Sequence, residues 1–244
     1  MASNRYLWRE SFKLDDAPRL PCPRCKDGQV FVERNTISSS TVADSLEYFE
    51  ENGADPEFDY QRFVLLMTCN NGKCRETVAV AGTTKFQETR SWMGDLSYDT
   101  FFEPQTMIPG PALMVIPDGT PSKAAEAMRQ AFTAFWGDRG AAANRLRISV
   151  ERIMDAENID PTKKLYQRID DFGIAHPDLT DTLDALRHVG NLGSHDGDVG
   201  REELLAAFEI YQEWLRDYYG RYKDRIAAMT AELVANKGKL TSRF

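Results

Sequence analysis

The sequence predicts an α+β protein, with a small β domain at the N-terminus followed by an all-α bundle of four to five helices. Segments rich in β-branched and aromatic residues, bounded by Gly and Asn turns, occur before residue 94. After residue 120 the period changes, and apolar residues recur at the spacing of amphipathic helices. We therefore expect three regions: a β domain over residues 1–93, a packed connector over 94–120 and the helical bundle over 121–244.

Three strands are expected in the β domain, at Gln29–Arg34, Arg62–Cys69 and Glu76–Gly82. A polar and acidic stretch, Ser38–Asp59, lies between the first two. It predicts a solvated loop or short helix inserted into a hairpin.

The connector is rich in proline and aromatic residues. Five prolines between Gly94 and Pro121 exclude a continuous helix. Apolar residues such as Phe101, Phe102 and Met107 indicate that this stretch packs along a surface.

Helix starts are marked at Thr120-Pro121 and Asp160-Pro161, where an N-cap residue precedes proline at the first helical position. The last helix is expected to be long, from about Glu202 to Ala235. Short connections favour antiparallel neighbours and hence a bundle. The apolar positions of the five expected helices are, in chain order, Ala124, Met128, Phe132 and Phe135; Leu146, Val150, Ile153 and Met154; Leu165, Ile169 and Phe172; Leu179, Leu183, Leu186 and Val189; and Leu205, Phe208, Trp214, Leu215, Tyr218 and Tyr222.

All four cysteines occur in two close pairs beside the strands: Cys22 and Cys25 in CPRC, and Cys69 and Cys74 in CNNGKC. A hairpin would bring the two turns together, giving a tetrahedral four-sulfur zinc site and a small β zinc ribbon. Four unrelated buried cysteines are the alternative, which the paired spacing disfavours. Because protein ligands would fill all four positions, the zinc is expected to be structural and not catalytic.

The composition narrows the class of protein. The formal net charge is −8, which disfavours non-specific wrapping of nucleic acid but leaves a local basic groove open. We expect no signal peptide and no membrane span, reduced cysteines and a cytoplasmic location. A glycine-rich phosphate loop, a nucleophile elbow and an open metal triad are absent from the sequence, so a metabolic enzyme has no support.

The segment LRHVGNLGSHD, Leu186–Asp196, holds the candidate catalytic residues Arg187, Asn191 and His195. Residues four apart share one face of a helix, so the three form one strip if the helix continues. A histidine suits proton transfer at an RNA 2′-hydroxyl, and an arginine suits charge stabilisation at the phosphate. The structural alternative is a helix end, with Asn191 in a turn, His195 donating to a carbonyl and Arg187 paired with a nearby Asp.

The helical half resembles a known family. Segments beginning PDGTPSKAAEAM and DTLDALRHVGNLGSHD, with the long final helix, resemble the bacterial family numbered four-one-four-five among domains of unknown function. The resemblance covers about Ile116 to Tyr222, and its most specific parts are LRISVE, at 146–151, and R-x2-GN-x3-H, at 187–195. That family is grouped with the HEPN helical bundles, and its members often carry a cysteine-rich N-terminal extension. The resemblance therefore implies a HEPN-like bundle.

Many HEPN proteins are metal-independent ribonucleases of toxin and antiphage systems, in which a homodimer lines one cleft with two Arg–His motifs. The resemblance assigns Arg187 and His195 to that role, with Asn191 as a polar neighbour. Seven residues intervene here, more than in the usual motif, and correspond to about 12 Å of rise on a straight helix. The two side chains would then meet only if the chain bends, for which Gly190 and Gly193 are available.

Two functions are therefore open. One is a HEPN-like ribonuclease, or its inactive scaffold, in bacterial defence or toxin systems. The other is a non-catalytic module that binds RNA or a protein partner and dimerises through the bundle. Convergence of Arg187 and His195 in a solvent-accessible groove would favour the first, and the acidic insert at Ser38–Asp59 favours a protein partner.

Overall fold

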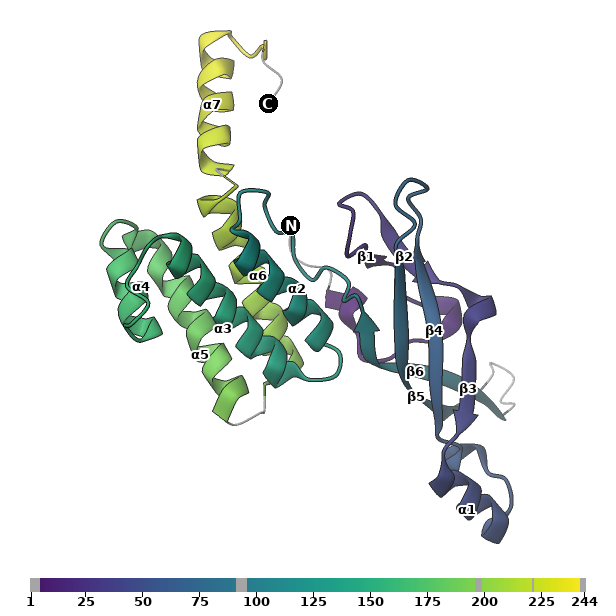
Figure 1. Cartoon of the computed structure of the whole chain (residues 1–244). Helices are drawn as coiled ribbons and strands as arrows, with labels where there is room; N and C mark the ends of the chain where they lie inside the picture. The colour runs from purple at the N-terminus through teal and green to yellow at the C-terminus, as the bar shows by residue number, and fades with distance from the viewer. Residues whose placement is uncertain (1–4, 91–95, 196–198, 221, 242–244) are drawn as a thin grey trace. The chain divides into compact units, whose positions relative to one another are not determined.

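The computed structural model describes residues 5–90, 96–195, 199–220 and 222–241, with the side chains of 194 and 195 outside the description, and it confirms the α+β class (Figure 1). The chain forms two compact units. The first comprises residues 1–113 and 129–142, and the second 114–128 and 143–244. In the part of the chain that the structure describes, every helix is too short or too polar to span a membrane.

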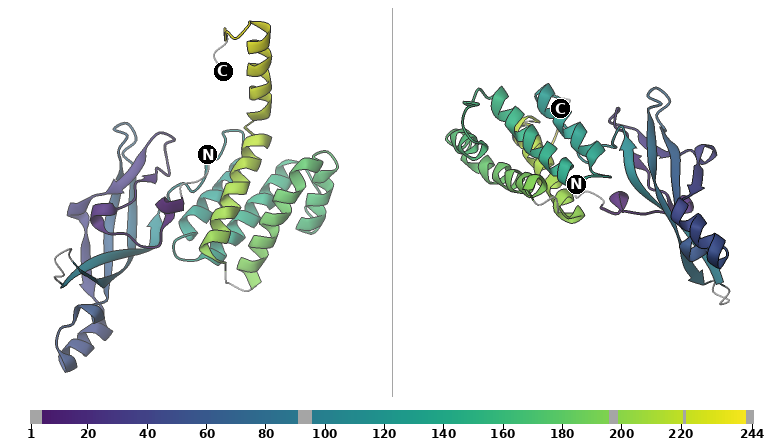
Figure 2. Two further views of the ribbon diagram at one scale, coloured as in Figure 1. Left: turned by 180° about the vertical axis from the view of Figure 1, so that it is seen from behind. Right: turned by 60° about the horizontal axis from the view of Figure 1, so that its bottom comes forward.

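One curled antiparallel sheet dominates the first unit, as Figure 2 shows. The strands run in the order β1-β2-β4-β5-β6, and β3 also pairs with β4. Their bounds are β1 Leu20–Pro21, β2 Gln29–Val32, β3 Ser38–Thr41, β4 Gln61–Cys69, β5 Thr77–Arg90 and β6 Leu96–Ile108. The predicted hairpin is present as the β2–β4 pair, and the acidic insert between these strands contains β3 and the helix α1, Ala43–Asn52.

The alternation of β4 explains which face of the sheet is buried. Phe63, Leu65 and Met67 are buried, whereas Val64 and Leu66 between them are exposed. Successive side chains of a strand point to opposite faces, so the odd-numbered residues form the core. Cross-strand pairing of Leu65 with Val80 and of Met67 with Val78 extends this core onto β5.

The expected connector, 94–120, differs from the structure in that about half of it is the strand β6. Residues 96–108 pair along β5, which itself extends to Arg90. β6 lies at the end of the strand order. On its other side Phe12 forms an isolated bridge with Phe102, and the described residues place no further strand there. Pro104 is tolerated at such an edge, where a missing amide costs no ladder hydrogen bond.

The second unit is helical. The helices are α2 Ser122–Ala134, α3 Arg139–Ala156, α4 Leu165–Gly173, α5 Thr180–His195, α6 Arg201–Tyr218 and α7 Tyr222–Ala235, and the first two also contribute residues to the first unit. The single long helix expected from 202 to 235 is two helices. The amides of Tyr219 and Gly220 both donate to the carbonyl of Leu215, which closes α6.

The core of the second unit is apolar, and two polar groups buried on α6 have hydrogen-bond partners. Tyr211 is fully buried on α6, and its hydroxyl lies 2.9 Å from that of Ser149 on α3. Trp214 packs one turn further on, and its indole N–H donates to the carbonyl of Leu179 at 2.9 Å. Since an unpaired buried polar group is costly, these bonds fix how α6 meets α3 and the start of α5.

An ion pair joins α3 to α4. Arg168 is buried and donates to Asp155 at 2.7 Å and to the carbonyl of Ile159 at 3.2 Å. Burial alone would raise the pKa of Asp155, but hydrogen bonds from Arg168 and Arg152 lower it below its usual value. The charged carboxylate is therefore the form that stabilises the folded state.

Replacing Asp155 by Asn should destabilise the protein at pH 7 by about 1–3 kcal/mol, because a charge-assisted hydrogen bond to a buried arginine is weakened. The folded pKa lies below the unfolded value of about 3.9, so the contribution is present above that value and is lost as the pH falls through the folded pKa. Urea unfolding of the wild type and of the Asp155→Asn variant at pH 7 and pH 3.5 measures the difference in their free energy of unfolding. A stability difference that stays equal at the two pH values would contradict it.

Candidate functional site

The four cysteines converge at one end of the sheet in the first unit. Cys22 follows β1, Cys69 is the last residue of β4, and Cys25 and Cys74 lie in the following turns. The sulfur atoms of all four lie within 4.8 Å of one another. Sγ–Sγ distances are 3.8 Å between Cys22 and Cys74 and 3.7 Å between Cys25 and Cys69. The predicted pairing of the two cysteine turns into one cluster is thus confirmed.

Backbone hydrogen bonds shape each turn. The Cys22 amide donates to the carbonyl of Gly28 at 2.9 Å, and the Cys69 amide donates to the carbonyl of Glu76 at 2.8 Å. Within the turns, amides point back at sulfur: Cys25 N–H donates to Cys22 Sγ at 3.4 Å, and Asn71 N–H donates to Cys69 Sγ at 3.5 Å. Each of these bonds alone would lower the pKa of the thiol that accepts it, but burial outweighs them, and the pKa of Cys22 and of Cys69 is raised.

The cluster has the dimensions of a four-thiolate metal site. A tetrahedron with metal–sulfur bonds of about 2.3 Å has edges of about 3.8 Å, which is the separation found in both close pairs. Cys22 and Cys69 are buried and Cys25 and Cys74 are half-buried, so the site is closed by protein. Burial alone would raise the pKa of Cys25, but hydrogen bonds from Cys74, Cys69 and Cys22 lower it to about 7. A soft divalent ion is therefore the ligand class that the donor set fits.

Gly28 leaves the space that the thiols occupy. A Cβ atom at this position would lie 2.4 Å from Cys69 Sγ and 2.8 Å from Cys25 Sγ. Gly72, in the other cysteine turn, has open space where its Cβ would be. Only the first glycine is therefore required by the packing of the sulfur atoms.

In the second unit, α5 carries the Arg–His segment and is continuous from Thr180 to His195. Gly190 and Gly193 lie within this helix and do not end it. The bend that would bring the candidate residues together within one chain is not formed along this helix. The side chain of His195 lies outside the described part of the structure, and so does Asp196, the last residue of the segment.

Arg187 contacts two residues of its own helix, and one of them is an aspartate, as the structural alternative for this segment expected. Its Nε donates to Asp184 at 2.7 Å, and a terminal nitrogen lies 2.8 Å from Nε2 of His188. Asp184 also lies 3.3 Å from the same imidazole nitrogen. The hydrogen bond from Arg187 lowers the pKa of Asp184 below its usual value, more than burial raises it. Asp184 lies three residues before Arg187 and four before His188. These spacings place side chains on one face of a helix, so the sequence indicates this cluster.

Asn191 is half-buried one turn beyond Arg187. On α3, Arg147 and Glu151 form the ion pair that their i, i+4 spacing in the sequence favours, at 2.9 Å. Gly190 faces this helix closely, since a Cβ atom there would lie 2.4 Å from Cβ of Arg147 and 3.2 Å from the carbonyl oxygen of Ala143. The glycine of the R-x2-GN segment therefore permits α3 and α5 to approach each other.

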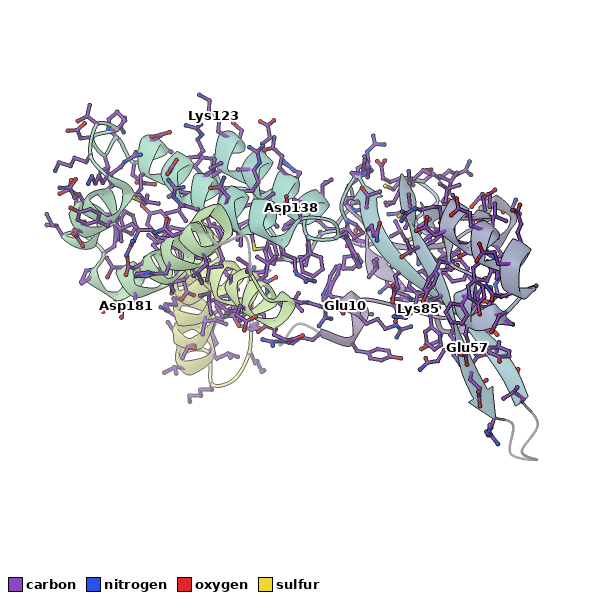
Figure 3. All side chains as sticks on the ribbon, turned by 90° about the horizontal axis from the view of Figure 1, so that it is seen from below. Glu10, Glu57, Lys85, Lys123, Asp138 and Asp181 are labelled. Atoms are coloured by element: carbon purple, nitrogen blue, oxygen red, sulfur yellow. The ribbon has the colours of Figure 1, made fainter. Side chains whose placement is uncertain are left out.

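A groove on the second unit is acidic. It has a volume of about 350 Å³, and Ile210 and Trp214 contribute apolar lining. The charged side chains of its lining are Asp178, Glu209, Glu213, Asp217 and Lys223. Elsewhere on the helices both signs of charge occur, as Lys123 and Asp181 illustrate in Figure 3. The groove therefore suits a basic ligand better than a polyanion.

Comparison with known proteins gives two family matches. Residues 129–242 match the model of the family described as Domain of unknown function (DUF4145), which supports the resemblance of the helical half to that family. Residues 10–106 match the model of a second family, Domain of unknown function (DUF8608), and this match runs through most of β6. Each match covers less than half of the chain. No curated protein and no solved structure matches the chain.

Replacing Gly28 by Ala should weaken metal binding by about tenfold or more, because the new methyl group displaces two sulfur atoms from their positions. The matched variant Gly72→Ala adds the same group where space is open and should bind metal as the wild type does. Competition against a chromophoric chelator, with Co²⁺ or Zn²⁺ added to the reduced chain, measures both affinities. Equal losses in the two variants would refute the role of Gly28.

Gly190→Ala should destabilise the helical unit by about 1–3 kcal/mol, although alanine is the better helix former, because its methyl group overlaps Arg147 on α3. Leu192→Ala, at a half-exposed position two residues away, is the control and should cost less. Chemical denaturation followed by circular dichroism compares them. A Gly190→Ala protein more stable than wild type would show that the helices do not need this close approach.

Proposed function

We propose that the cysteine cluster holds a structural zinc ion that ties the two cysteine turns together, as in a zinc ribbon. Zinc prefers tetrahedral thiolate sites, and closed four-cysteine sites contribute folding energy instead of an open position for water. Cys22, Cys25, Cys69 and Cys74 would be the four ligands, with amide N–H groups holding the sulfur atoms in place. The ion would stabilise this end of the sheet and supply no reaction chemistry.

For the helical unit, a HEPN-like bundle that acts as a non-catalytic binding scaffold is the best-supported function. One observation carries this proposal. The guanidinium of Arg187 donates to Asp184, which precedes it on α5, whereas His195 lies further along the same helix, at its C-terminal end. The eight-residue step from Arg187 to His195 on a continuous helix is a rise of about 12 Å. Arg187 thus has a structural role that needs no substrate.

The partner class that the surface favours is a protein, and the scaffold would act as a homodimer. The formal charge of −8 and the acidic groove with Ile210 and Trp214 in its lining both oppose a phosphate backbone. They suit a partner that presents basic and apolar side chains. A location in the cytoplasm agrees with four cysteines that are reduced or metal-bound.

A metal-independent ribonuclease, the activity that the HEPN resemblance implies, is the second candidate. The 2.8 Å contact of Arg187 with His188 favours it, because an arginine then lies beside an exposed imidazole on the helix surface. In this alternative Arg187 would stabilise the phosphate, His195 would transfer the proton, and Asn191 would orient the substrate. A bacterial defence or toxin system is the setting that the resemblance implies for such an enzyme.

The test is the integrity of cellular RNA after induced expression of wild type, Arg187→Ala and His195→Ala, with His188→Ala as a further variant. The scaffold proposal predicts intact RNA in all four cultures, with one zinc ion per folded chain by elemental analysis. Purified wild type should also leave a single-stranded RNA uncut at high protein concentration. Folding of each variant is checked by circular dichroism.

RNA cleavage by the wild type that is lost in Arg187→Ala or His195→Ala would overturn the scaffold and establish the ribonuclease. Cleavage lost only in His188→Ala would assign the histidine role to that residue. A folded wild-type chain without zinc, prepared with zinc present and under reducing conditions, would refute the structural metal. The two halves of the proposal therefore fail independently.

A further inference from the structure

The four sulfur atoms of the cysteine cluster lie in two close pairs, and each pair joins the two cysteine turns. Cys22 Sγ lies 3.8 Å from Cys74 Sγ, and Cys25 Sγ lies 3.7 Å from Cys69 Sγ. A disulfide has a sulfur–sulfur bond of about 2.05 Å, so each pair would have to close by about 1.7 Å. Rotation of both side chains about their Cα–Cβ bonds can supply a movement of this size. The separations therefore allow two disulfides in place of one bound ion.

Contacts around Cys25 favour this pairing over one within a turn. Its sulfur atom accepts a hydrogen bond from Nδ2 of Asn71, which belongs to the other cysteine turn, at 3.7 Å. The sulfur atoms of Cys25 and Cys69 also meet in the space that a Cβ atom of Gly28 would fill. The sulfur of Cys25 therefore faces the second turn.

Each close pair combines one accessible cysteine with one buried cysteine. Cys25 and Cys74 are half-buried, whereas their partners Cys69 and Cys22 are buried. The residues that flank the two half-buried cysteines in the chain are all exposed, namely Arg24, Lys26, Lys73 and Arg75. A small oxidant can therefore reach one sulfur of each pair from the solvent, and the other sulfur lies next to it. An accessible cysteine beside a second, resolving cysteine is typical of thiols that are oxidised reversibly.

We propose that the cluster is a peroxide-sensitive switch, in which Cys22–Cys74 and Cys25–Cys69 disulfides form across the two turns and the bound metal ion is released. This inference rests on the structural metal of the proposed function and adds a regulation to the same site. A sulfur atom joined to another sulfur has no thiolate left to bind a metal ion. One disulfide already removes two of the four ligands.

The oxidant in this proposal is hydrogen peroxide. In the first step Cys25 Sγ attacks one peroxide oxygen and the O–O bond breaks, which leaves a sulfenic acid on the sulfur and releases the second oxygen as water. Cys69 Sγ then attacks the Cys25 sulfur, the S–O bond breaks, and that oxygen also leaves as water. The two thiols supply the protons, or the solvent does where the sulfur atoms are thiolates. Each disulfide therefore consumes one peroxide and yields two water molecules.

Cys74 and Cys22 react in the same order, so two peroxide molecules convert the four sulfur atoms to two disulfides. All the electrons pass from sulfur to peroxide oxygen, so a divalent ion is released without a change in its charge. The disulfides join the same two turns that the ion would join, so the pairing of β2 with β4 is kept. A dithiol reductant reverses the change by thiol–disulfide exchange and restores the four ligands.

The first experiment treats the full zinc-loaded chain with two equivalents of hydrogen peroxide. A chromophoric chelator follows the release of zinc, and the remaining thiols are alkylated before digestion with trypsin and mass spectrometry. Trypsin cleaves after lysine and arginine, which places the four cysteines in four different peptides, at residues 20–24, 25–26, 63–73 and 74–75. Each possible disulfide therefore gives its own pair of linked peptides.

We expect zinc to be released, with peptide 25–26 linked to 63–73 and peptide 20–24 linked to 74–75. Catalase added before the peroxide is the control and should leave the zinc bound, and a dithiol reductant should restore zinc binding after oxidation. Linkage of 20–24 to 25–26, or of 63–73 to 74–75, as the main product would overturn the pairing across the turns. Zinc that stays bound in a large excess of peroxide would overturn the switch.

A second experiment tests which sulfur atoms react first. One equivalent of peroxide is added together with a cyclic diketone that traps sulfenic acids. In the wild type, Cys25 and Cys74 should carry several times more label than Cys22 and Cys69. Label mainly on the two buried cysteines would overturn the assigned order.

Two matched variants extend this measurement, because each removes one buried sulfur. Cys69→Ser should raise the label on Cys25 severalfold, and Cys22→Ser should raise it on Cys74, since the trapped sulfenic acid has lost its resolving partner. Circular dichroism checks that both variants fold. An equal rise at Cys25 and Cys74 in each variant would contradict the assigned pairs. The wild-type label tests the order without depending on either variant.

The outcomes separate this inference from the proposed function. A chain that binds zinc and keeps it in peroxide would overturn the switch and leave the structural metal in place. A folded, reduced chain that binds no zinc would overturn the metal and the switch together. Neither result bears on RNA cleavage or on the binding scaffold, which have their own measurements.

Discussion

The pairing of β2 with β4 is the constraint on which the cysteine cluster depends, because the two cysteine turns lie 44 residues or more apart in the chain. Val30 pairs with Cys69, and Gln29 accepts a hydrogen bond from the amide of Asn70 just beyond the end of β4. A shift of one residue in the pairing register of β2 and β4 would turn Cys69 to the other face of the sheet and away from Cys25. The apolar alternation of β4 sets this register, so the same residues that build the core also align the sulfur atoms. A metal ion at the cluster would in turn hold the register.

In the second unit, close packing of α3 and α5 explains much of the segment that resembles the family motif. Gly190 permits the approach, Arg147 and Glu151 form an ion pair on the facing helix, and Arg187 is held by Asp184. Each of these residues satisfies a packing or hydrogen-bonding requirement of the bundle itself. Residues that match a catalytic pattern can therefore be required for folding alone, which is why the proposed scaffold needs no active site.

The apolar surface of α7 follows from where α6 ends. The close of α6 at Tyr219 and Gly220 prevents one long helix from packing its whole apolar side into the bundle. The residues beyond the break keep the periodic pattern of a buried helix but lack its burial.

The sequence by itself determined the α+β class, the two cysteine pairs that meet, and the ion pair of Arg147 with Glu151. These features depend on local period or short spacing, which the order of residues expresses directly. Only the tertiary structure decided that residues 96–108 are an edge strand, that the final helix is divided, and that Arg187 contacts Asp184 and His188. For residues 96–108 the reason is that an edge strand tolerates prolines that a central strand excludes. For Arg187 the reason is that several acceptors lie within reach of one arginine side chain. Which of them it binds depends on the packing of the helices around it, and that packing is set by contacts between residues distant in the sequence.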